Sequence, residues 1–162
     1  MKRVATFNEI DFKMLIATLC IAFAVHFEAR GEPLEGQKMV AQTVMTRAED
    51  SGKEPCEVVL KKAAYDKSIK KYVVLTKNGP KLTKKGEILA ENLQKCVKKC
   101  VFWVAKRAKL AGKPPSRVEF FHELSIKPHW AAHMKPVKRV GGHIFYARKR
   151  PLVDPPGRSV RS

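Results

Sequence analysis

Residues 11–30 have the sequence DFKMLIATLCIAFAVHFEAR, and this stretch decides the fold. From Met14 to Val25 it contains no charged residue and is apolar on every side of a helix. A helix that is apolar all round is either buried in the centre of a protein or crosses a membrane. The uncharged run has 12 residues, whereas crossing a bilayer requires about 20. We therefore expect a central core helix, with the other elements packed around it, and no transmembrane segment.

A targeting segment is the alternative interpretation of the same stretch. Basic residues precede it, and Ala22–Phe23–Ala24 gives the small-x-small pattern that precedes a signal-peptide cleavage site. However, Glu9 and Asp11 lie in the leading segment, unlike the positively charged start of a signal peptide. Cleavage there would also remove the helix that leads into residues 26–37. We therefore favour a buried core helix over a signal peptide or signal-anchor.

The periodicity of apolar residues predicts the other helices. A second helix is expected over residues 34–49, because apolar residues recur there at every fourth position. Residues 56–60 (CEVVL) are expected to begin a third, and residues 72–75 (YVVL) to form a short strand before a turn at 78–80 (NGP). Residues 86–111 are predicted to form one continuous helix, with an apolar stripe and most lysines off that stripe.

Two β-type segments lie near the end of the sequence. Residues 118–123 (VEFFHE) and 143–148 (HIFYAR) contain aromatic residues in partial alternation and are predicted to pair antiparallel. Residues 151–162 have the composition of a disordered basic tail. A chain of 162 residues suffices for one domain with a core, but hardly for two. We predict a single α+β domain over residues 1–150, mostly α, with a small antiparallel sheet late in the chain.

Charge is distributed unevenly along the chain. Residues 1–60 carry 7 Lys+Arg and 9 Asp+Glu, whereas residues 61–162 carry 26 and 6, which accounts for the net charge of +18. A basic field of this size speeds association with any polyanion, such as nucleic acid, anionic lipid or an anionic cell envelope. The charge therefore indicates a class of partner but no reaction.

The four cysteines, Cys20, Cys56, Cys96 and Cys100, form no CxxC pair, and no histidine cluster has zinc-finger spacing. We therefore expect no metal site. The cysteines are interpreted as small buried hydrophobic residues with reduced thiols. Reduced thiols suit a protein made and stored in a cytoplasm. A disulfide or metal role is the alternative interpretation, and Cys96 and Cys100, four positions apart, would share one face of a helix.

The segment His26–Gln37 (HFEARGEPLEGQ) contains the residues suited to acid catalysis. Glu28 lies at the end of the apolar helix, where partial burial and the negative end of the helix dipole would both raise the pKa of its carboxyl group. A general acid requires a raised pKa of this kind. Glu32 follows four positions later, and Arg30 can keep one of the two carboxylates ionised. Taken alone, these residues also fit a solvated acidic turn after a helix.

Residues 26–47 (HFEARGEPLEGQKMVAQTVMTR) resemble the first block of the SleB-like cell-wall hydrolases. That family includes spore-cortex-lytic enzymes and phage endolysins. Three later segments resemble further family elements in the family's order. These are Phe121–His122, Pro128–Ala131 (PHWA) and Gly142–Tyr146 (GHIFY).

The resemblance implies a lysozyme-related, α-rich domain that cuts the glycan strand of peptidoglycan between N-acetylmuramic acid and N-acetylglucosamine, without a cofactor. It implies that Glu28 is the catalytic acid and that Glu32 supports it. Four further residues would line the saccharide groove: His122, Trp130, His143 and Tyr146. We expect a phage-encoded protein made in the host bacterial cytoplasm and delivered to the cell wall, with the basic residues binding the anionic envelope.

Two departures from the family pattern concern substrate contacts. The aromatic Phe-Ser-Trp-type element expected after the second helix is missing from residues 61–75, where Ala64–Tyr65–Asp66 is the nearest candidate. In the FHA-type element, Glu123 replaces the alanine.

The number of carboxylates distinguishes two reactions. A hydrolase that uses two carboxylates needs a second Asp or Glu about 5–9.5 Å from the acid. A lytic transglycosylase needs only one, because the 6-hydroxyl of the muramic acid attacks. Glu32 and Glu123 are the candidates for a second carboxylate, and neither is compelling. We therefore favour a lytic transglycosylase and keep a hydrolytic muramidase as the alternative.

Two rival functions explain the charge without the motif. A basic nucleic-acid-binding protein would account for +18, but it assigns no role to EARGEPLEGQ and predicts more aromatic residues among the lysines. The second rival is a membrane-disrupting helix over residues 86–111, which combine an apolar stripe with lysines as interfacial helices do. A core helix shows the same pattern, so this rival has no distinctive support. We therefore expect a cell-wall enzyme that requires no nucleic acid.

Overall fold

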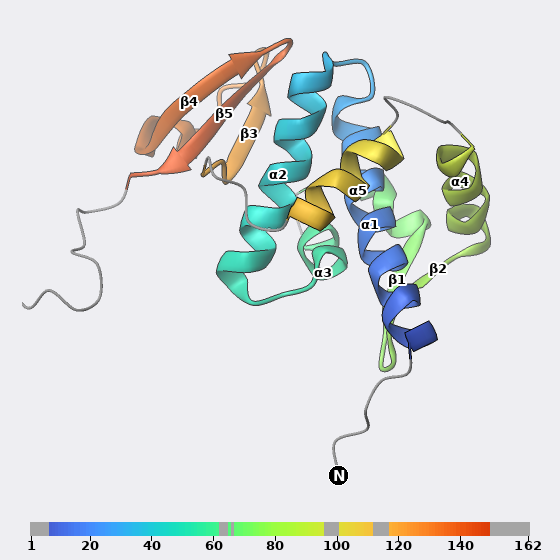
Figure 1. Cartoon of the computed structure of the whole chain (residues 1–162). Helices are drawn as coiled ribbons and strands as arrows, with labels where there is room; N and C mark the ends of the chain where they lie inside the picture. Colours follow the sequence, from blue (N-terminus) through green and yellow to red (C-terminus); the bar gives the residue numbers. More distant parts are fainter. Residues whose placement is uncertain (1–6, 62–64, 66, 96–100, 112–116, 150–162) are drawn as a thin grey trace, which may run out of the picture.

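The computed structural model describes residues 7–61, 65, 67–95, 101–111 and 117–149, in an α+β arrangement that is mostly helical, as predicted (Figure 1). In chain order, the elements are α1 (Phe7–Ala29), α2 (Leu34–Ser51), α3 (Pro55–Leu60), the 3-10 helix η1 (Lys67–Lys71), β1 (Val73–Thr76), β2 (Gly79–Leu82), α4 (Lys84–Gln94), α5 (Val101–Ala111), β3 (Phe120–Glu123), the 3-10 helix η2 (His129–His133), β4 (Met134–Val140) and β5 (His143–Arg148). The predicted tail at 151–162 lies outside the described residues.

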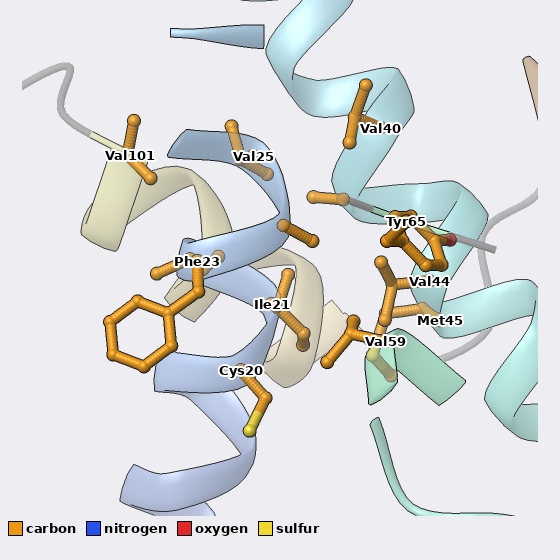
Figure 2. Close-up of a cluster of buried hydrophobic side chains, with 14 of the residues drawn as sticks. Cys20, Ile21, Phe23, Val25, Val40, Val44, Met45, Val59, Tyr65 and Val101 are labelled. Atoms are coloured by element: carbon orange, nitrogen blue, oxygen red, sulfur yellow. The ribbon is translucent and has the colours of Figure 1, made fainter. Parts of the chain in front are cut away.

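Helix α1 is the central element, and α2, α3 and α5 pack against it (Figure 1). Every residue from Leu19 to Val25 is at most 1% exposed. Their side chains meet Val40 and Val44 of α2 and Val101 of α5 in one core cluster (Figure 2). The prediction of a buried core helix is therefore confirmed.

Length and composition would also allow α1 to cross a membrane. Among the described helices, only α1 passes that test, over Asp11–Ala29. In the folded protein, however, 61% of this window is buried. The exposed apolar residues lie in its first turns, at Phe12, Met14 and Leu15.

The helix predicted over residues 86–111 is wrong as a single element. Two helices, α4 and α5, lie on either side of residues 96–100, which are outside the described part of the chain. Helix α5 packs on α1 and α2, whereas α4 lies beside β2 (Figure 1). One straight helix could not reach both positions. The apolar stripe gave no sign of the break, because both helices bury the same type of residue.

Two antiparallel sheets are present in the described residues. The predicted strand and turn at residues 72–80 form the β1–β2 hairpin, and β3 pairs antiparallel with β5 as predicted. Strand β4, on the other side of β5, was not predicted. Its sequence (MKPVKRV) contains Pro136, and almost all its residues are exposed, so it has no buried face to produce alternation. Pairing with β5, through an irregularity between Pro136 and Lys138, makes it a strand.

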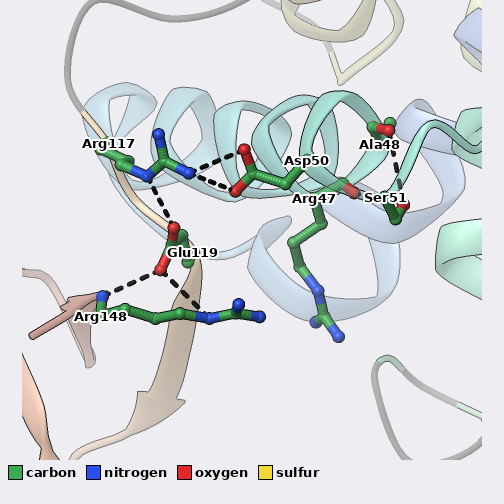
Figure 3. Close-up of polar contacts among 7 residues, drawn as sticks. All are labelled: Arg47, Ala48, Asp50, Ser51, Arg117, Glu119 and Arg148. Atoms are coloured by element: carbon green, nitrogen blue, oxygen red, sulfur yellow. Dashed lines mark hydrogen bonds and ion pairs between the residues drawn. The ribbon is translucent and has the colours of Figure 1, made fainter. Parts of the chain in front are cut away.

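A buried carboxylate, Glu119, fastens the three-stranded sheet to α2 (Figure 3). Its Oε1 accepts a hydrogen bond from Arg117 Nε at 2.7 Å, and its Oε2 accepts one from the Arg148 backbone at 2.9 Å. Arg117 also donates to both carboxylate oxygens of Asp50, at the end of α2, at 2.7 Å. Asp50 and Glu119 together raise the pKa of the Arg117 guanidinium. This network holds the sheet against the helices.

A disulfide joins Cys20 of α1 to Cys56 of α3, with 5.1 Å between their Cα atoms. The expectation of reduced thiols is therefore wrong for these two residues, although both are buried as expected. The sequence could not reveal the pair, because only the packing of α3 on α1 brings positions 36 residues apart together. Disulfides persist in oxidising compartments, so the thiols no longer support cytoplasmic storage. Cys96 and Cys100 lie outside the described residues.

Replacing both Cys20 and Cys56 with alanine should lower the free energy of unfolding by about 4 kcal/mol, because the disulfide restricts the unfolded chain. Chemical denaturation with and without dithiothreitol measures this. Wild type should lose stability in the reductant, whereas the double variant should not respond to it. A wild-type midpoint that is unchanged by complete reduction would contradict the role of the disulfide.

Candidate active site

A pocket of about 480 Å³ lies where the end of α1 meets the three-stranded sheet. This volume is within the range of small-molecule sites, about 300–1,000 Å³. Three segments far apart in the sequence line the pocket. They are Phe27, Glu28, Arg30, Gly31 and Glu32 at the end of α1 and just after it, Glu123, Leu124 and Ser125 at the end of β3 and just after it, and Gly142 and His143 at the β4–β5 turn.

Glu28 reaches this pocket from the last turn of α1, the helix whose middle is fully buried. Its neighbour Ala29 is in the core, whereas Glu28 itself is half-buried. The Glu32 backbone N–H donates to the Ala29 carbonyl at 3.0 Å and closes the turn after the helix. The predicted catalytic acid is therefore held on a rigid element and borders the pocket.

Glu32 links the loop after α1 to the turn between β4 and β5. Its Oε2 accepts a hydrogen bond from the Gly142 backbone N–H at 2.9 Å, and its Oε1 lies 3.4 Å from Nδ1 of the buried His143. The Gln37 side chain donates to the Glu32 carbonyl at 3.2 Å. The structure thus brings Glu32 and His143 to the pocket beside Glu28, with the Glu32 carboxylate already engaged.

Gly141 permits the close approach of this turn to Glu32. Its φ of +55° lies in the left-handed region, and a Cβ on it would fall 1.8 Å from Glu32 Oε2. A larger residue would therefore have to push the carboxylate away from Gly142. The two glycines therefore form the turn and also allow the Glu32 carboxylate to lie against it: Gly141 leaves the space, and the Gly142 N–H donates the hydrogen bond.

Glu123 is the third carboxylate that lines the pocket. It is the last residue of β3, lies opposite His143 in the strand register and is exposed. Ser125 Oγ lies 3.4 Å from its Oε2 and donates to it. The residue that departs from the family pattern therefore lies in the same pocket as Glu28.

Tyr65 is the residue whose position the sequence left uncertain. Its ring is buried in the core beside Val40 and Val44 (Figure 2), with its centroid 6.1 Å from that of Phe121 and 5.5 Å from the Arg47 guanidinium. Burial raises the pKa of the Tyr65 hydroxyl; Arg47 opposes this shift and the Glu28 charge adds to it. Tyr65 is therefore a protonated residue close enough to Glu28 to interact electrostatically. In the sequence, its signal was its place in Ala64–Tyr65–Asp66, the nearest candidate for the missing aromatic element.

His122, Trp130 and Tyr146 form a separate cluster, and the structure does not bring them to the pocket. His122 Nε2 and the Tyr146 hydroxyl are 2.9 Å apart, and the ring centroids of Trp130 and Tyr146 are 5.5 Å apart. Side chains alternate between the faces of a sheet. Phe121 and Phe145 therefore face the core, while His122 and Tyr146 lie on the other face.

No group of three or more His, Cys, Asp or Glu side chains within the described residues could hold a metal ion. His26, just before the pocket, lies against Arg30, with 3.3 Å between Nε2 and the guanidinium nitrogen. Burial and the Arg30 charge both lower the pKa of His26, so its ring is neutral near pH 7. The ionisable groups that border the pocket are thus three carboxylates, Arg30 and His143.

Comparison with known proteins identifies one family. The model of the family described as Cell Wall Hydrolase matches residues 31–146, most of the chain. The match begins three residues after Glu28 and includes Glu32, Glu123 and the β4–β5 turn. No curated protein and no solved structure matches the chain.

Gly141→Ala should lower the free energy of unfolding more than Gly52→Ala does. Both residues have positive φ, but nothing lies within 4 Å of a Cβ at Gly52, so that variant measures the backbone cost alone, about 1–3 kcal/mol. In a Glu32→Ala background, the extra cost at Gly141 should shrink, leaving the contact with Pro33 Cδ at 2.8 Å. Denaturant titration of the four variants measures this coupling. Additive effects of Gly141→Ala and Glu32→Ala would argue against the contact.

Proposed function

Because the chain belongs to the cell wall hydrolase family, we propose that it cleaves the glycan strands of peptidoglycan with Glu28 as the general acid. One observation carries this proposal: Glu28, at the end of the buried core helix, borders a pocket that contains two further carboxylates. A general acid must be held within hydrogen-bonding reach of the bond it protonates. The buried α1 supplies that rigidity, and the pocket supplies the space for a sugar.

The favoured reaction is that of a lytic transglycosylase, which cuts between N-acetylmuramic acid and N-acetylglucosamine. Glu28 would protonate the glycosidic oxygen as the bond from that oxygen to the muramic C1 breaks. The Glu28 carboxylate would then take the proton from the muramic 6-hydroxyl, whose oxygen bonds to C1 and closes an anhydro ring. Glu32 is held by Gly142 and lies against His143, which supports a positioning role rather than that of a second catalytic carboxylate.

Hydrolysis is the second candidate, and the position of Glu123 favours it. Glu123 lines the same pocket as Glu28 from a different element, and its only described side-chain hydrogen bond is from Ser125 at 3.4 Å. An exposed carboxylate there could activate a water molecule, as a muramidase with two carboxylates requires. The product ends distinguish the two reactions.

The basic second part of the chain supports a further element of the proposal. We propose that its lysines draw the protein to an anionic bacterial envelope, as suits a phage-encoded enzyme delivered from the cytoplasm of the host to the wall. A nucleic-acid-binding protein would share this charge. That rival assigns no role to a pocket with three carboxylates, which would repel a phosphate backbone.

Glu28→Gln should reduce the release of glycan fragments from purified sacculi by at least about 100-fold, because an amide cannot donate the proton. Its thermal midpoint should stay close to that of wild type. Glu35→Gln is the matched control, since Glu35 is an exposed glutamate paired with Lys138 and does not line the pocket. A folded Glu28→Gln protein with full activity would refute the proposal.

Mass spectrometry of the products tests the choice of reaction. For a lytic transglycosylase, the products should carry 1,6-anhydro-muramic ends, and Glu123→Gln should change turnover by less than about 10-fold. Reducing ends, together with a loss of turnover in Glu123→Gln comparable to that of Glu28→Gln, would establish hydrolysis with Glu123 as the second carboxylate.

A further inference from the structure

We propose that the end of the molecule farthest along α1 from Glu28 is a docking surface for an anionic lipid bilayer, which it binds peripherally without inserting α1. This surface, called here the apolar end, consists of the first turns of α1 and the β1–β2 hairpin (Figure 1), together with α4, which lines one groove with α1 and β2. The strand β2 contacts both α1 and α4, so these elements are neighbours. The proposal concerns a binding surface and does not rest on the reaction at Glu28.

Exposed apolar side chains are concentrated at the apolar end. Ten large apolar side chains are exposed in the described part of the chain, and six of them lie here. They are Phe12, Met14 and Leu15 of α1, Val74 and Leu75 of β1, and Ile88 of α4. Phe12, Leu75 and Ile88 are 59%, 52% and 60% exposed. Scattered exposed apolar residues are ordinary, but a group of neighbouring ones marks an interaction site.

A groove of about 630 Å³ crosses the apolar end between α1, β2 and α4. Apolar residues form much of its lining, namely Phe12, Leu15, Ile16, Leu19, Leu82 and Ala90. Charged and polar side chains complete the lining, namely Lys81, Glu87, Glu91, Gln94 and Lys95. A groove lined by both apolar and charged side chains suits a ligand that has both acyl chains and charged headgroups.

The charge of this end selects an anionic partner. Among the side chains that the structure describes from residue 11 on, its exposed ionisable residues are Lys13, Lys77, Lys81, Lys84, Lys85 and Lys95, against Asp11, Glu87 and Glu91. Glu91 is already paired with Lys95 at 3.2 Å, so the uncompensated charge is positive. Apolar side chains surrounded by lysines are typical of surfaces that bind the headgroup region of anionic membranes. A second copy of the chain would place these lysines against one another.

Two features of the fold oppose insertion of α1 across the bilayer. Most of its apolar window is buried, and withdrawing it would expose the core from Leu19 to Val25 to water. The disulfide between Cys20 and Cys56 also ties the middle of α1 to α3. Only the first turns of α1 are free to enter the headgroup region, so the binding should be peripheral.

Docking in this way would orient the active-site pocket. Phe12 and Glu28 lie on the same helix, 16 positions apart, which corresponds to about 24 Å at 1.5 Å per residue. With Phe12 at the bilayer surface, the pocket at Glu28 would lie at the other end of the helix, away from the lipid. A cell-wall enzyme held on the membrane would then present its pocket to the wall.

Flotation of the full chain with lipid vesicles tests the proposal. The protein should bind vesicles of phosphatidylglycerol and phosphatidylcholine, and bind pure phosphatidylcholine at least 10-fold more weakly. The triple variant Phe12→Gln, Leu75→Gln, Ile88→Gln should lose at least 10-fold in partitioning. Its control, Leu110→Gln, Ile126→Gln, Val137→Gln, removes three exposed apolar residues elsewhere and should bind like wild type.

A charge-matched pair separates local from overall electrostatics. Lys77→Gln, Lys81→Gln, Lys84→Gln should weaken binding more than Lys106→Gln, Lys127→Gln, Lys135→Gln, which removes the same charge from exposed sites elsewhere. Equal loss in the two variants, or equal binding to both kinds of vesicle, would overturn the proposal.

Two further readouts identify other occupants. Bound protein that resists extraction by alkaline carbonate would show that α1 inserts, and it would overturn peripheral docking. Light scattering that shows a dimer, abolished by the apolar-end variant, would assign this surface to a second copy if no vesicle binding is seen. Glu28→Gln should bind vesicles like wild type, which separates failure of this proposal from failure of the proposed reaction.

Discussion

Burial of α1 is the constraint on which the rest of the structure depends. Its middle is apolar on every side, so no arrangement that leaves one side in water is stable. Helices α2, α3 and α5 cover it, and the disulfide between Cys20 and Cys56 fastens the short α3 in place. The same burial makes the end of α1 a rigid support. Glu28 lies on the last turn of this buried helix rather than on a loop, and a helix holds a functional side chain more precisely than a loop does.

The pocket depends on a second, smaller set of contacts that joins the sheet to the helices. The buried Glu119 connects the sheet to α2 through Arg117 and Asp50, and Glu32 connects the loop after α1 to the β4–β5 turn. Both links are carboxylates that accept backbone or guanidinium hydrogen bonds, and hydrogen bonds to a charged group are stronger than those between neutral groups. Three carboxylates border the pocket, and one of them, that of Glu32, is already held by its hydrogen bond to the β4–β5 turn.

The two ends of α1 suit different tasks. At its C-terminal end ionisable side chains border a pocket, and at its N-terminal end exposed apolar side chains lie beside a groove that lysines and glutamates also line. This difference explains why the sequence of the helix is ambiguous. A run that is apolar enough to cross a membrane serves in the folded protein as a core, with its first turns left exposed.

The sequence by itself determined the elements whose residues carry a local pattern. The all-apolar run predicted α1, the four-residue repeat predicted α2, and alternating aromatic residues predicted β3 and β5, because each periodicity reflects the burial of one element. Glu28 could be proposed as the acid from the sequence alone, since the motif that contains it is contiguous. Strand β4 has no buried face, and the break between α4 and α5 leaves no mark in a stripe of similar residues, so neither was predicted.

Tertiary structure alone decided which of these elements meet. The pair Cys20–Cys56 spans 36 positions and the contact from Glu32 to Gly142 spans 110, and no local pattern specifies a partner at such distances. The clearest example is the set of residues predicted to line the saccharide groove, which the structure divides between the two faces of one sheet. His143 borders the pocket, while Tyr146, three residues later on the same strand, faces the other side of the sheet. The alternation was visible in the sequence, but which face would meet Glu28 depended on how the sheet packs against α1 and α2.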